Sequence, residues 1–435
     1  MPAWQEEFRG KHMTAARALG AVQSGERVVF GHAAGEPRVL VDELVRQADR
    51  LRGVEVVHMV PLYECAYARP EHAASFRHNA LFVGAGSREA VNAGRADYTP
   101  CFFSEIPRLF RDRILPVDVA LIQLSPPDAH GYMSFGVSVD YTLQAAASAR
   151  FTVAEINPRM PRTHGSSIHV SEVDAFVEVD YPLPEIPLPV ITEVEEKIGA
   201  NIASLVPDGA TLQLGIGAIP DAVLKFLGNK TDLGIHTEMF SDGVVALYER
   251  GVVTNRFNTL NPGKLTATFL MGTRLLYEFV HDNPAVNMKP VDYTNSVLVA
   301  GRLANLISIN SAIEIDLKGQ VCSEMIGPRQ FSAVGGQVDF VRAASASAGG
   351  KSIIAFPSTG KNGAVSRIVA ALSAGASVTT SRSDVHFVVT EHGIAELRGK
   401  SIRQRAEALI AIANPDFRES LRAQASHGQA AAARA

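Results

Sequence analysis

Glu238 is a carboxylate that follows a glycine-rich turn in the sequence, and the two together could carry out covalent chemistry. The residues of the turn are Gly215, Ile216, Gly217, Ala218 and Ile219. Backbone N–H groups in such a turn, where a helix begins, bind phosphate or stabilise an oxyanion. A carboxylate held beside them can act as a nucleophile. The alternative is that Glu238 caps the next element or pairs with a cation, and the pattern alone leaves both readings open.

The glycine turn matches neither of two common nucleotide-binding loops. It lacks the third glycine of the dinucleotide-binding fingerprint and the Lys-Ser/Thr pair of a Walker loop. Taken by itself, it is also compatible with a plain tight connection between a strand and a helix.

Two further glycine loops could face a ligand. Gly335 and Gly336 lie within residues 333–340, and adjacent glycines allow a ligand to approach the backbone closely. A hairpin turn is the alternative. Lys361, in the glycine turn 358–363, is either a phosphate ligand or a solvated side chain.

His32 has the place in the first half of the chain that the Gly215 turn has in the second half. It could contact a substrate carboxylate, or it could be a buried histidine whose partners are all within the fold. Asp128 and His130 lack the additional ligands that a metal site requires, so no metal is expected there.

Short apolar runs alternate with helical patterns along the chain, which predicts βαβ units and mainly parallel sheets. In a strand over 234–238, His236 and Glu238 would point to the same face. The runs predicted as strands are residues 27–31, 54–60, 117–124, 151–156, 212–215, 234–238, 265–270, 306–309, 352–356, 376–380 and 385–390.

The chain contains a short internal echo. Residues 22–40 and 206–224 share one order of features: a turn glycine, a strand, a glycine turn, a proline and a helix. The echo indicates two halves of similar design. The proline-rich stretch 181–190 can continue neither a helix nor a central strand. We therefore predict one domain over residues 1–185 and a second over residues 186–435.

The composition excludes several classes of function. The net charge is −4 with both signs scattered, so no basic stripe argues for nucleic acid. No apolar run is long enough to span a bilayer, and the first residues lack the apolar core of a signal peptide. Cys65, Cys101 and Cys322 are few and far apart, which fits reduced thiols and leads us to expect a cytoplasmic protein.

Several motifs together closely resemble the acetyl-CoA hydrolase/transferase family, the glutamate-type (class I) CoA-transferases. The resemblance covers the chain nearly from end to end and is strongest to the members that act on 4-hydroxybutyrate. This combination of motifs is far more specific than any single glycine loop. The motifs are SPPDAHGY at 125–132, LPEIPLP at 183–189, LQLGIGAIPDAVL at 212–224, GIHTEMFSDG at 234–243, FSAVGGQVDFVRAAS at 331–345, TTSRSDVHFVVTEHGIAELRGKS at 379–401 and IANPDFRESL at 412–421.

The resemblance implies two similar open α/β domains with the active site between them. It implies that Glu238 is the nucleophile and becomes a glutamyl-CoA thioester, and that His32 lies on the acyl-substrate side. The residues implied to contact CoA are Gly215, Ile216, Gly217, Ala218, Ile219, Ile313, Gly335 and Gly336.

The implied activity is ping-pong transfer of CoA from an acyl-CoA to a short-chain acid such as 4-hydroxybutyrate, butyrate or acetate. The alternatives are an itaconate or succinate CoA-transferase, an acyl-CoA hydrolase on the same scaffold, and a non-catalytic CoA-binding sensor. CoA is expected as a substrate, with no permanently bound cofactor, no metal and no membrane partner, in a homo-oligomer. The sequence departs from the 4-hydroxybutyrate enzymes at residues 31–37 and 58–71, the loops expected to line the acyl pocket.

Overall fold

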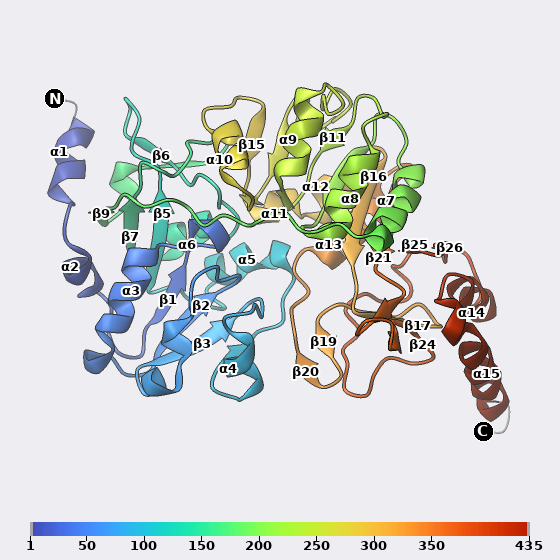
Figure 1. The fold of residues 1–435 in the computed structure, drawn as a ribbon. Helices are drawn as coiled ribbons and strands as arrows, with labels where there is room; N and C mark the ends of the chain where they lie inside the picture. The colour runs from blue at the N-terminus through green and yellow to red at the C-terminus, as the bar shows by residue number, and fades with distance from the viewer. Residues whose placement is uncertain (1–2, 433–435) are drawn as a thin grey trace. The chain divides into compact units, whose positions relative to one another are not determined.

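The computed structural model describes residues 3–432, and within them the chain forms two compact α/β units (Figure 1). Unit 1 runs to Pro187 and includes Lys264–Thr294, and unit 2 consists of Leu188–Gly263 and the chain from Asn295 onward. The predicted boundary at 185/186 assigned residues 264–294 to the second domain, whereas the chain returns to unit 1 over these residues. The return is held by backbone hydrogen bonds to the loop that precedes α6: Val139 N–H donates to Thr268 O at 3.1 Å, and Leu270 N–H donates to Val137 O at 2.8 Å.

Unit 1 is built on a seven-stranded sheet with the strand order β4-β3-β2-β1-β5-β7-β9. All of its paired strands are parallel, as the alternation of the sequence predicts. The strands are β1 (Arg27–Phe30), β2 (Val54–His58), β3 (Phe76–Ala80), β4 (Asp97–Tyr98), β5 (Val119–Leu124), β7 (Phe151–Ile156) and β9 (Ala175–Glu178).

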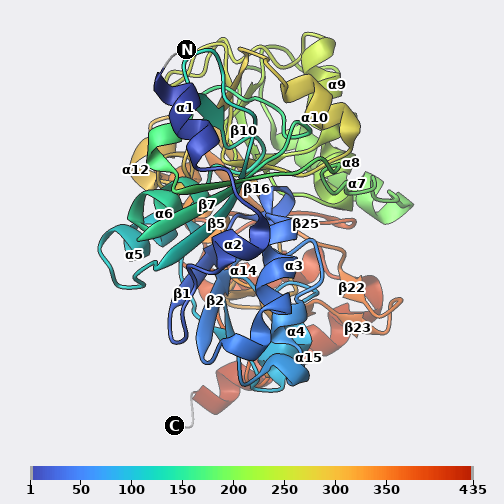
Figure 2. The same ribbon diagram turned by 90° about the vertical axis from the view of Figure 1, so that its left-hand side faces the viewer.

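Helices cover both faces of this sheet (Figure 2). On one face, α2 and α3 pack on a core that contains the fully buried Leu19, Phe30, Leu40, Leu44 and Leu121. Burial of each such side chain stabilises the fold by about 1.5–3 kcal/mol relative to exposure. The helices and remaining strands of unit 1 are α1 (Ala3–Gly10), α2 (Ala15–Leu19), α3 (Arg38–Arg46), α4 (Arg88–Asn92), α5 (Ile106–Arg111), β6 (Tyr132–Ser134), α6 (Thr142–Ser148), β8 (Ser167–His169), β13 (Leu265–Ala267), β14 (Phe269–Leu270), α10 (Arg274–Val280), β15 (Val286–Met288) and α11 (Val291–Thr294).

Unit 2 is built on a six-stranded sheet with the strand order β11-β10-β16-β21-β25-β26. Its paired strands are parallel except for the hairpin of β25 and β26. The strands of the sheet are β10 (Thr211–Leu214), β11 (Gly234–Ile235), β16 (Leu306–Ser311), β21 (Lys351–Ala355), β25 (Phe387–Thr390) and β26 (Gly393–Glu396).

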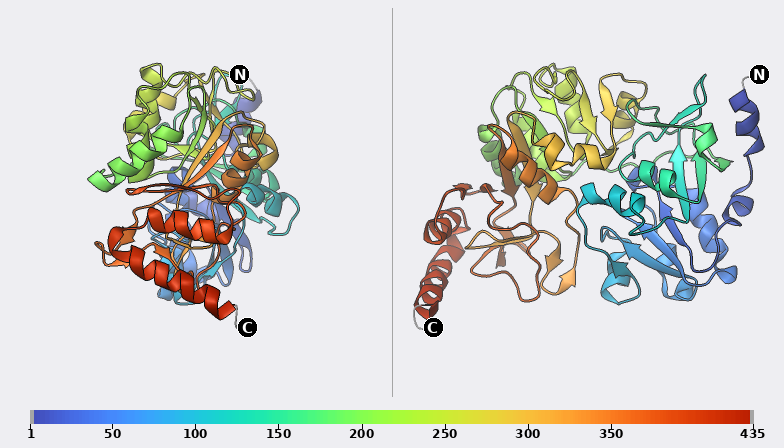
Figure 3. Two further views of the ribbon diagram at one scale, coloured as in Figure 1. Left: turned by 90° about the vertical axis from the view of Figure 1, so that its right-hand side faces the viewer. Right: turned by 180° about the vertical axis from the view of Figure 1, so that it is seen from behind.

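Helices α7 and α8 lie on one side of the strands of unit 2 and α13 lies on the other (Figure 3, left). Helices α7 and α8 pack closely because Gly199 has no Cβ, which would lie 2.8 Å from the backbone carbon of Ala222. The remaining elements of unit 2 are α7 (Glu193–Leu205), α8 (Ala218–Phe226), β12 (Met239–Phe240), α9 (Asp242–Glu249), α12 (Val297–Ala300), β17 (Glu314–Asp316), β18 (Val321–Cys322), β19 (Met325–Ile326), β20 (Arg329–Gln330), α13 (Gln337–Ala346), β22 (Thr359–Gly360), β23 (Val365–Ser366), β24 (Ile368–Val369), α14 (Ile402–Ala411) and α15 (Pro415–Ala432).

One predicted strand is wrong. Residues 376–380 form no strand, and only Thr380 makes a bridge, to Val321. Val378 is 48% exposed, and only the end of the run is buried, where the Thr379 and Thr380 N–H groups donate to Val321 O, so pairing with β18 does not extend into a strand. Within the described residues, none of the helices combines the length and apolar character needed to cross a bilayer.

Each sheet has a point where its strand order reverses. In unit 1 the chain moves outward from β1 to β2 on one side and from β5 to β7 on the other. In unit 2 the same reversal occurs between β10 and β16. Open α/β sheets bind ligands outside the carboxyl ends of the strands at such a switch point. The two copies of the internal echo contain β1 and β10, so each places its glycine turn at a switch point.

Candidate active site

Glu238 lies in a bend between β11 and β12, just beyond the carboxyl end of β11. The predicted strand 234–238 therefore ends early, at Ile235. Thr237 explains the change in direction, because its buried hydroxyl is bonded to the end of β10 rather than being exposed on a strand face. Leu214 N–H donates to Thr237 Oγ1 at 3.1 Å, and the hydroxyl lies 3.0 Å from Leu214 O. The residue before Glu238 is thus attached to the residue before the Gly215 turn.

The carboxylate of Glu238 is held by an amide. Asn295 Nδ2 donates to Glu238 Oε2 at 2.9 Å, and Asn295 is fully buried while Glu238 is half-buried. The buried amide orients the carboxylate, and the half-buried position of Glu238 leaves the carboxylate partly accessible. A nucleophile requires both.

Gly336 lies directly against this carboxylate. A Cβ at position 336 would be 1.8 Å from Glu238 Oε2 and 2.3 Å from Asn295 Nδ2. The φ of Gly336 is −94°, which any residue can adopt, so the site needs glycine here for space and not for backbone freedom. Gly335 differs, because its φ of 56° lies in the left-handed region that favours glycine.

The amino end of α13 begins at Gly336, beside the Glu238 carboxylate. The first N–H groups of a helix have no partner within the helix, and the helix dipole is positive at this end. Both features favour negative charge at the position of the carboxylate and of any oxyanion formed on it.

The Gly215 turn connects β10 to α8 at the switch point of unit 2. Gly217 is the N-cap of α8 and has a φ of 112°, which a side chain would disfavour. The Ile216 side chain is 47% exposed. The turn therefore presents backbone N–H groups and an exposed apolar side chain at the edge of the sheet where a ligand is expected.

Helix α9 packs on α8 and fixes the chain that follows Glu238. Ser241 Oγ donates to Asp221 Oδ1 at 3.0 Å, and a Cβ on Gly243 would lie 2.7 Å from Leu224 Cδ1. Burial raises the pKa of Asp221, the Ser241 hydrogen bond opposes the rise, and the neighbouring Asp242 adds to it.

Ile313 lies two positions beyond β16, the strand next to β10, and its side chain is half-buried. It is therefore at the same edge of the sheet as the Gly215 turn. Lys361 and Asn362 have φ values of 49° and 56°, and the loop that contains them is anchored where Ser358 N–H donates to Glu391 at 2.8 Å.

His32 belongs to unit 1, where it lies two positions beyond the end of β1 at the switch point. Its ring is fully buried, and Nδ1 lies 3.2 Å from a carboxylate oxygen of Asp140. Asp140 also accepts from Ser138 Oγ at 2.6 Å and from Tyr141 N–H at 2.7 Å. Since an ionised carboxylate only accepts, Nδ1 is the donor in this contact. In the part of the chain that the structure describes, Nε2 has no hydrogen-bond partner.

The Asp128 carboxylate accepts hydrogen bonds within the turn that it begins. Its Oδ1 accepts from His130 N–H at 2.8 Å and from Tyr132 N–H at 2.9 Å. Among the described residues, no three His, Cys, Asp or Glu side chains are grouped so that they could hold a metal ion.

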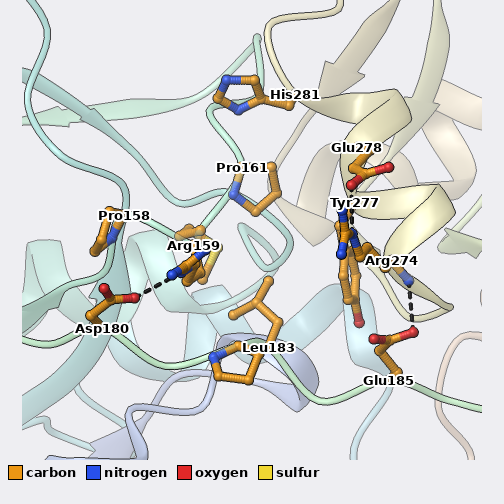
Figure 4. A pocket seen from close by; sticks show the side chains of 12 residues that line it. Pro158, Arg159, Pro161, Asp180, Leu183, Glu185, Arg274, Tyr277, Glu278 and His281 are labelled. Atoms are coloured by element: carbon orange, nitrogen blue, oxygen red, sulfur yellow. Dashed lines mark hydrogen bonds and ion pairs between the residues drawn. The ribbon is translucent and has the colours of Figure 1, made fainter.

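None of the predicted site residues lines a pocket of about 640 Å³ in unit 1. Figure 4 shows Arg159 paired with Asp180 on one side of this pocket, and Arg274 beside Glu278 on the other. Both arginines of the lining are paired with carboxylates, and Glu185 accepts from the Arg274 backbone N–H at 2.9 Å, so neither arginine is a free cation for an anionic ligand.

Sequence reasoning missed Asn295, Thr237 and Asp140. None of them has a local signal, since each acts through a contact with a residue distant in the sequence. The internal echo at 22–40 and 206–224 is the signal that could have identified them, because it places a glycine turn after the strand beside each switch point.

The chain belongs to the acetyl-CoA hydrolase/transferase family. The N-terminal domain of that family matches residues 2–192 and its C-terminal domain matches residues 272–425. This result confirms the resemblance predicted from the sequence.

The 4-hydroxybutyrate coenzyme A transferase of Clostridium kluyveri is 57% identical over 96% of this chain and 98% of its own length. The succinyl-CoA:cyclohexane-1-carboxylate CoA transferase of Geobacter metallireducens is 47% identical over 96% of each chain. Among solved structures, RipA from Yersinia pestis superposes with a TM-score of 0.93 at 39% identity, covering 98% of this chain and 99% of its own. The relatives with curated names at this level of identity are CoA-transferases, so CoA transfer is the activity class of the chain.

Proposed function

We propose that the chain moves CoA from an acyl-CoA to a short-chain carboxylic acid of the 4-hydroxybutyrate, butyrate or acetate type, with Glu238 as the nucleophile. The observation that carries the proposal is the half-buried Glu238 carboxylate, bonded to Asn295 and facing a glycine whose missing Cβ leaves space at the same oxygen. The names of full-length relatives support the choice of acids.

The proposed reaction balances without a cofactor. A Glu238 carboxylate oxygen attacks the thioester carbonyl of the donor, the C–S bond breaks, and CoA leaves as a thiolate, giving an acyl-glutamyl anhydride. The thiolate then attacks the glutamyl carbonyl, the C–O bond to the acyl group breaks, and the donor acid leaves as its carboxylate. The enzyme now holds a glutamyl-CoA thioester. An acceptor acid reverses the two steps, so the kinetics are ping-pong.

Each attack forms a tetrahedral oxyanion that needs hydrogen-bond donors already in place. Asn295 Nδ2 and the backbone N–H groups at the start of α13 are the donors we assign to this role. Loss of one oxyanion donor typically costs about 100- to 1000-fold in turnover. We assign CoA binding to Gly215, Ile216, Gly217, Ala218 and Ile219 together with Ile313 and Gly335, and the acyl group to His32.

We further propose that the enzyme works in the cytoplasm as a homo-oligomer and uses CoA only as a substrate. Support for the compartment comes from the cysteines, all of which lie in the described residues and none of which is in a disulfide. The oligomer rests on the family resemblance.

The direct test is an acceptor assay. The wild type, Glu238→Ala and Asn295→Ala are each given butyryl-CoA with acetate, 4-hydroxybutyrate, succinate or itaconate, and the new acyl-CoA is measured by chromatography. We expect transfer by the wild type, no transfer by Glu238→Ala, and a turnover about 100-fold lower for Asn295→Ala. Glu249→Ala, at an exposed glutamate at the end of α9, serves as the matched control. Release of free CoA and acid with no dependence on an acceptor would instead identify a hydrolase.

A further inference from the structure

Glu36 is a buried carboxyl group that the proposed mechanism does not use. It lies in the loop between β1 and α3, which also carries His32, and it is 1% exposed. The backbone N–H groups of Leu62 and Tyr63 donate to its carboxyl. These two residues belong to the loop that follows β2, so one side chain joins the loops after two neighbouring strands of the sheet.

The end of β2 is joined to Glu36 as well. His58, the last residue of β2, is fully buried, and its Nε2 lies 3.9 Å from Glu36 Oε2. Neither atom has a hydrogen-bond partner elsewhere in the residues that the structure describes. The other ring nitrogen of His58 lies 3.3 Å from the Tyr67 hydroxyl, which donates to Cys65 Sγ at 3.4 Å. The loop after β2 is thus held at both of its ends by buried polar groups.

The loop that contains Glu36 is itself tightly constrained. A Cβ on Gly31 would lie 2.6 Å from Gly35 O, and a Cβ on Gly35 would lie 2.6 Å from Ser138 Cβ. Gln123 Nε2 donates to Glu36 O at 3.0 Å. Ser138 also donates to Asp140, which in turn contacts His32. One rigid segment therefore fixes both Glu36 and His32. Because this segment is rigid, any movement of the loop after β2 against it would change the space between that loop and His32.

We propose that Glu36 is a positioning residue that fixes the loop after β2 against the loop carrying His32 and so sets which acids the enzyme accepts. The inference rests on the proposed function, because it needs the acid to bind beside His32. The reason to place acid selection here is topological: β1 borders the switch point of unit 1, and the two loops follow the carboxyl ends of β1 and of its neighbour β2.

The surroundings of Glu36 favour its neutral form. Burial raises the pKa of Glu36 to about 8, the two backbone hydrogen bonds oppose the rise, and Asp42 and Glu155 add to it. Burial lowers the pKa of His58 well below its ordinary value. At 3.9 Å the carboxyl and the imidazole are in contact without a hydrogen bond, so burial favours both groups as neutral, and an ionised carboxylate would be buried there without a donor from His58.

The charged and titratable groups around Glu36 come from every element that packs on it. They are His58 on β2, Glu155 on β7, Asp42 and Arg38 on α3, Tyr141 beside α6, and Tyr63, Cys65 and Tyr67 on the loop after β2. Of these, Arg38 is the only cation, and it lies over the ring of Tyr63, 5.6 Å from the ring centroid. Ionisation of Glu36 above about pH 8 therefore leaves an anion without a compensating cation at the contact with His58.

The test compares Glu36→Gln with Glu36→Ala, using Asp49→Asn, at an exposed carboxylate elsewhere in unit 1, as the matched control. The KM values for the acceptor acid and for butyryl-CoA are measured from pH 6.5 to 9.5. In the wild type we expect the acid KM to rise above about pH 8. Glutamine can accept from Leu62 and Tyr63 as the carboxyl does but cannot ionise, so Glu36→Gln should match the wild type at pH 7 and lose the alkaline rise. Glu36→Ala should raise the acid KM about tenfold at pH 7, the effect of about one lost buried hydrogen bond, and alter selectivity among acids.

The inference is overturned if Glu36→Gln keeps the alkaline rise, or if the loss in Glu36→Ala falls equally on butyryl-CoA binding. Should Glu36→Ala fail to fold, the pH profile of Glu36→Gln still decides. A wild type that transfers CoA to none of the acids would instead refute the proposed function, on which the inference depends.

Discussion

At the scale of single residues, the candidate site depends on space as much as on functional groups. The contact of Asn295 with Glu238 orients the carboxylate, and the bare backbone of Gly336 leaves room around the oxygen that reacts. A substrate carbonyl must reach that oxygen to within about 3–3.5 Å. A side chain at 336 would occupy this space.

Gly336→Ala should therefore lower turnover by about 100-fold or more, because the added Cβ displaces the carboxylate and the donors around it. The fold should be little affected, since φ at 336 suits alanine. Gly10→Ala is the control, because a Cβ there meets nothing within 4 Å and the φ of Gly10 is not in the left-handed region. Steady-state turnover and melting temperature are measured together, and full activity in Gly336→Ala would remove Gly336 from the site.

At the scale of elements, the site is assembled by short connections at the carboxyl edge of the sheet in unit 2. Thr237 attaches the Glu238 bend to the end of β10, and the Gly215 turn follows that same strand end. The position of the turn and the position of the nucleophile are therefore coupled through Leu214.

Gly217→Val tests whether the turn binds CoA. Valine at a φ of 112° is strained by about 1–3 kcal/mol, and relief of the strain would move the N–H groups of the turn. We expect CoA affinity to fall about 100-fold if one donor is misplaced. Gly399→Val is the matched control, because Gly399 also has a positive φ, 75°, and its added Cβ also meets nothing within 4 Å. Equal CoA affinity in both variants, measured by calorimetry, would show that the turn is only a connection.

The sequence predicts the elements better than it predicts their contacts. Buried strands such as β5 and β7 are apparent from continuous apolar runs, because a parallel sheet covered on both faces requires them. The early end of β11 is not apparent, since it depends on the bond between Thr237 and Leu214. The return of residues 264–294 to unit 1 and the contact of Asn295 with Glu238 are likewise set by packing between distant segments. Glu238 and the glycine turns are apparent because their residue types carry the chemistry.

At the scale of the molecule, the two units repeat one design, with a glycine turn after the strand beside each switch point. Around its glycine turn, unit 1 also has a group of buried ionisable side chains, which the Gly215 turn of unit 2 does not have. Burial raises the pKa of Glu36 to about 8 and that of Glu155 to about 7, and it lowers the pKa of His78 to about 4.

These shifts predict how stability depends on pH. A carboxyl whose pKa is raised on folding contributes stability that is fully present below its unfolded pKa and is lost as pH rises to its folded pKa. Buried histidines with lowered pKa values act in the opposite direction, but only below about pH 6.5. Between pH 6.5 and 8 the raised pKa values of Glu36 and Glu155 lower stability as pH rises, so the free energy of unfolding of the wild type should fall across this window.

The double variant Glu36→Gln, Glu155→Gln should lose most of this pH dependence, measured by urea unfolding at pH 6.5 and pH 8. Asp49→Asn, which removes an exposed carboxylate elsewhere in unit 1, should leave it unchanged. A decline of equal size in the wild type and the double variant would show that these two carboxyls do not titrate in the window.

The central claim is that Glu238 carries CoA as a thioester. Incubation of the wild type with butyryl-CoA and no acceptor should give a protein adduct that contains CoA, detected by intact mass. Hydroxylamine should then modify a peptide that contains Glu238, and Glu238→Ala should give no adduct while still binding CoA. Modification at a cysteine or serine, or CoA transfer by Glu238→Ala, would contradict the account.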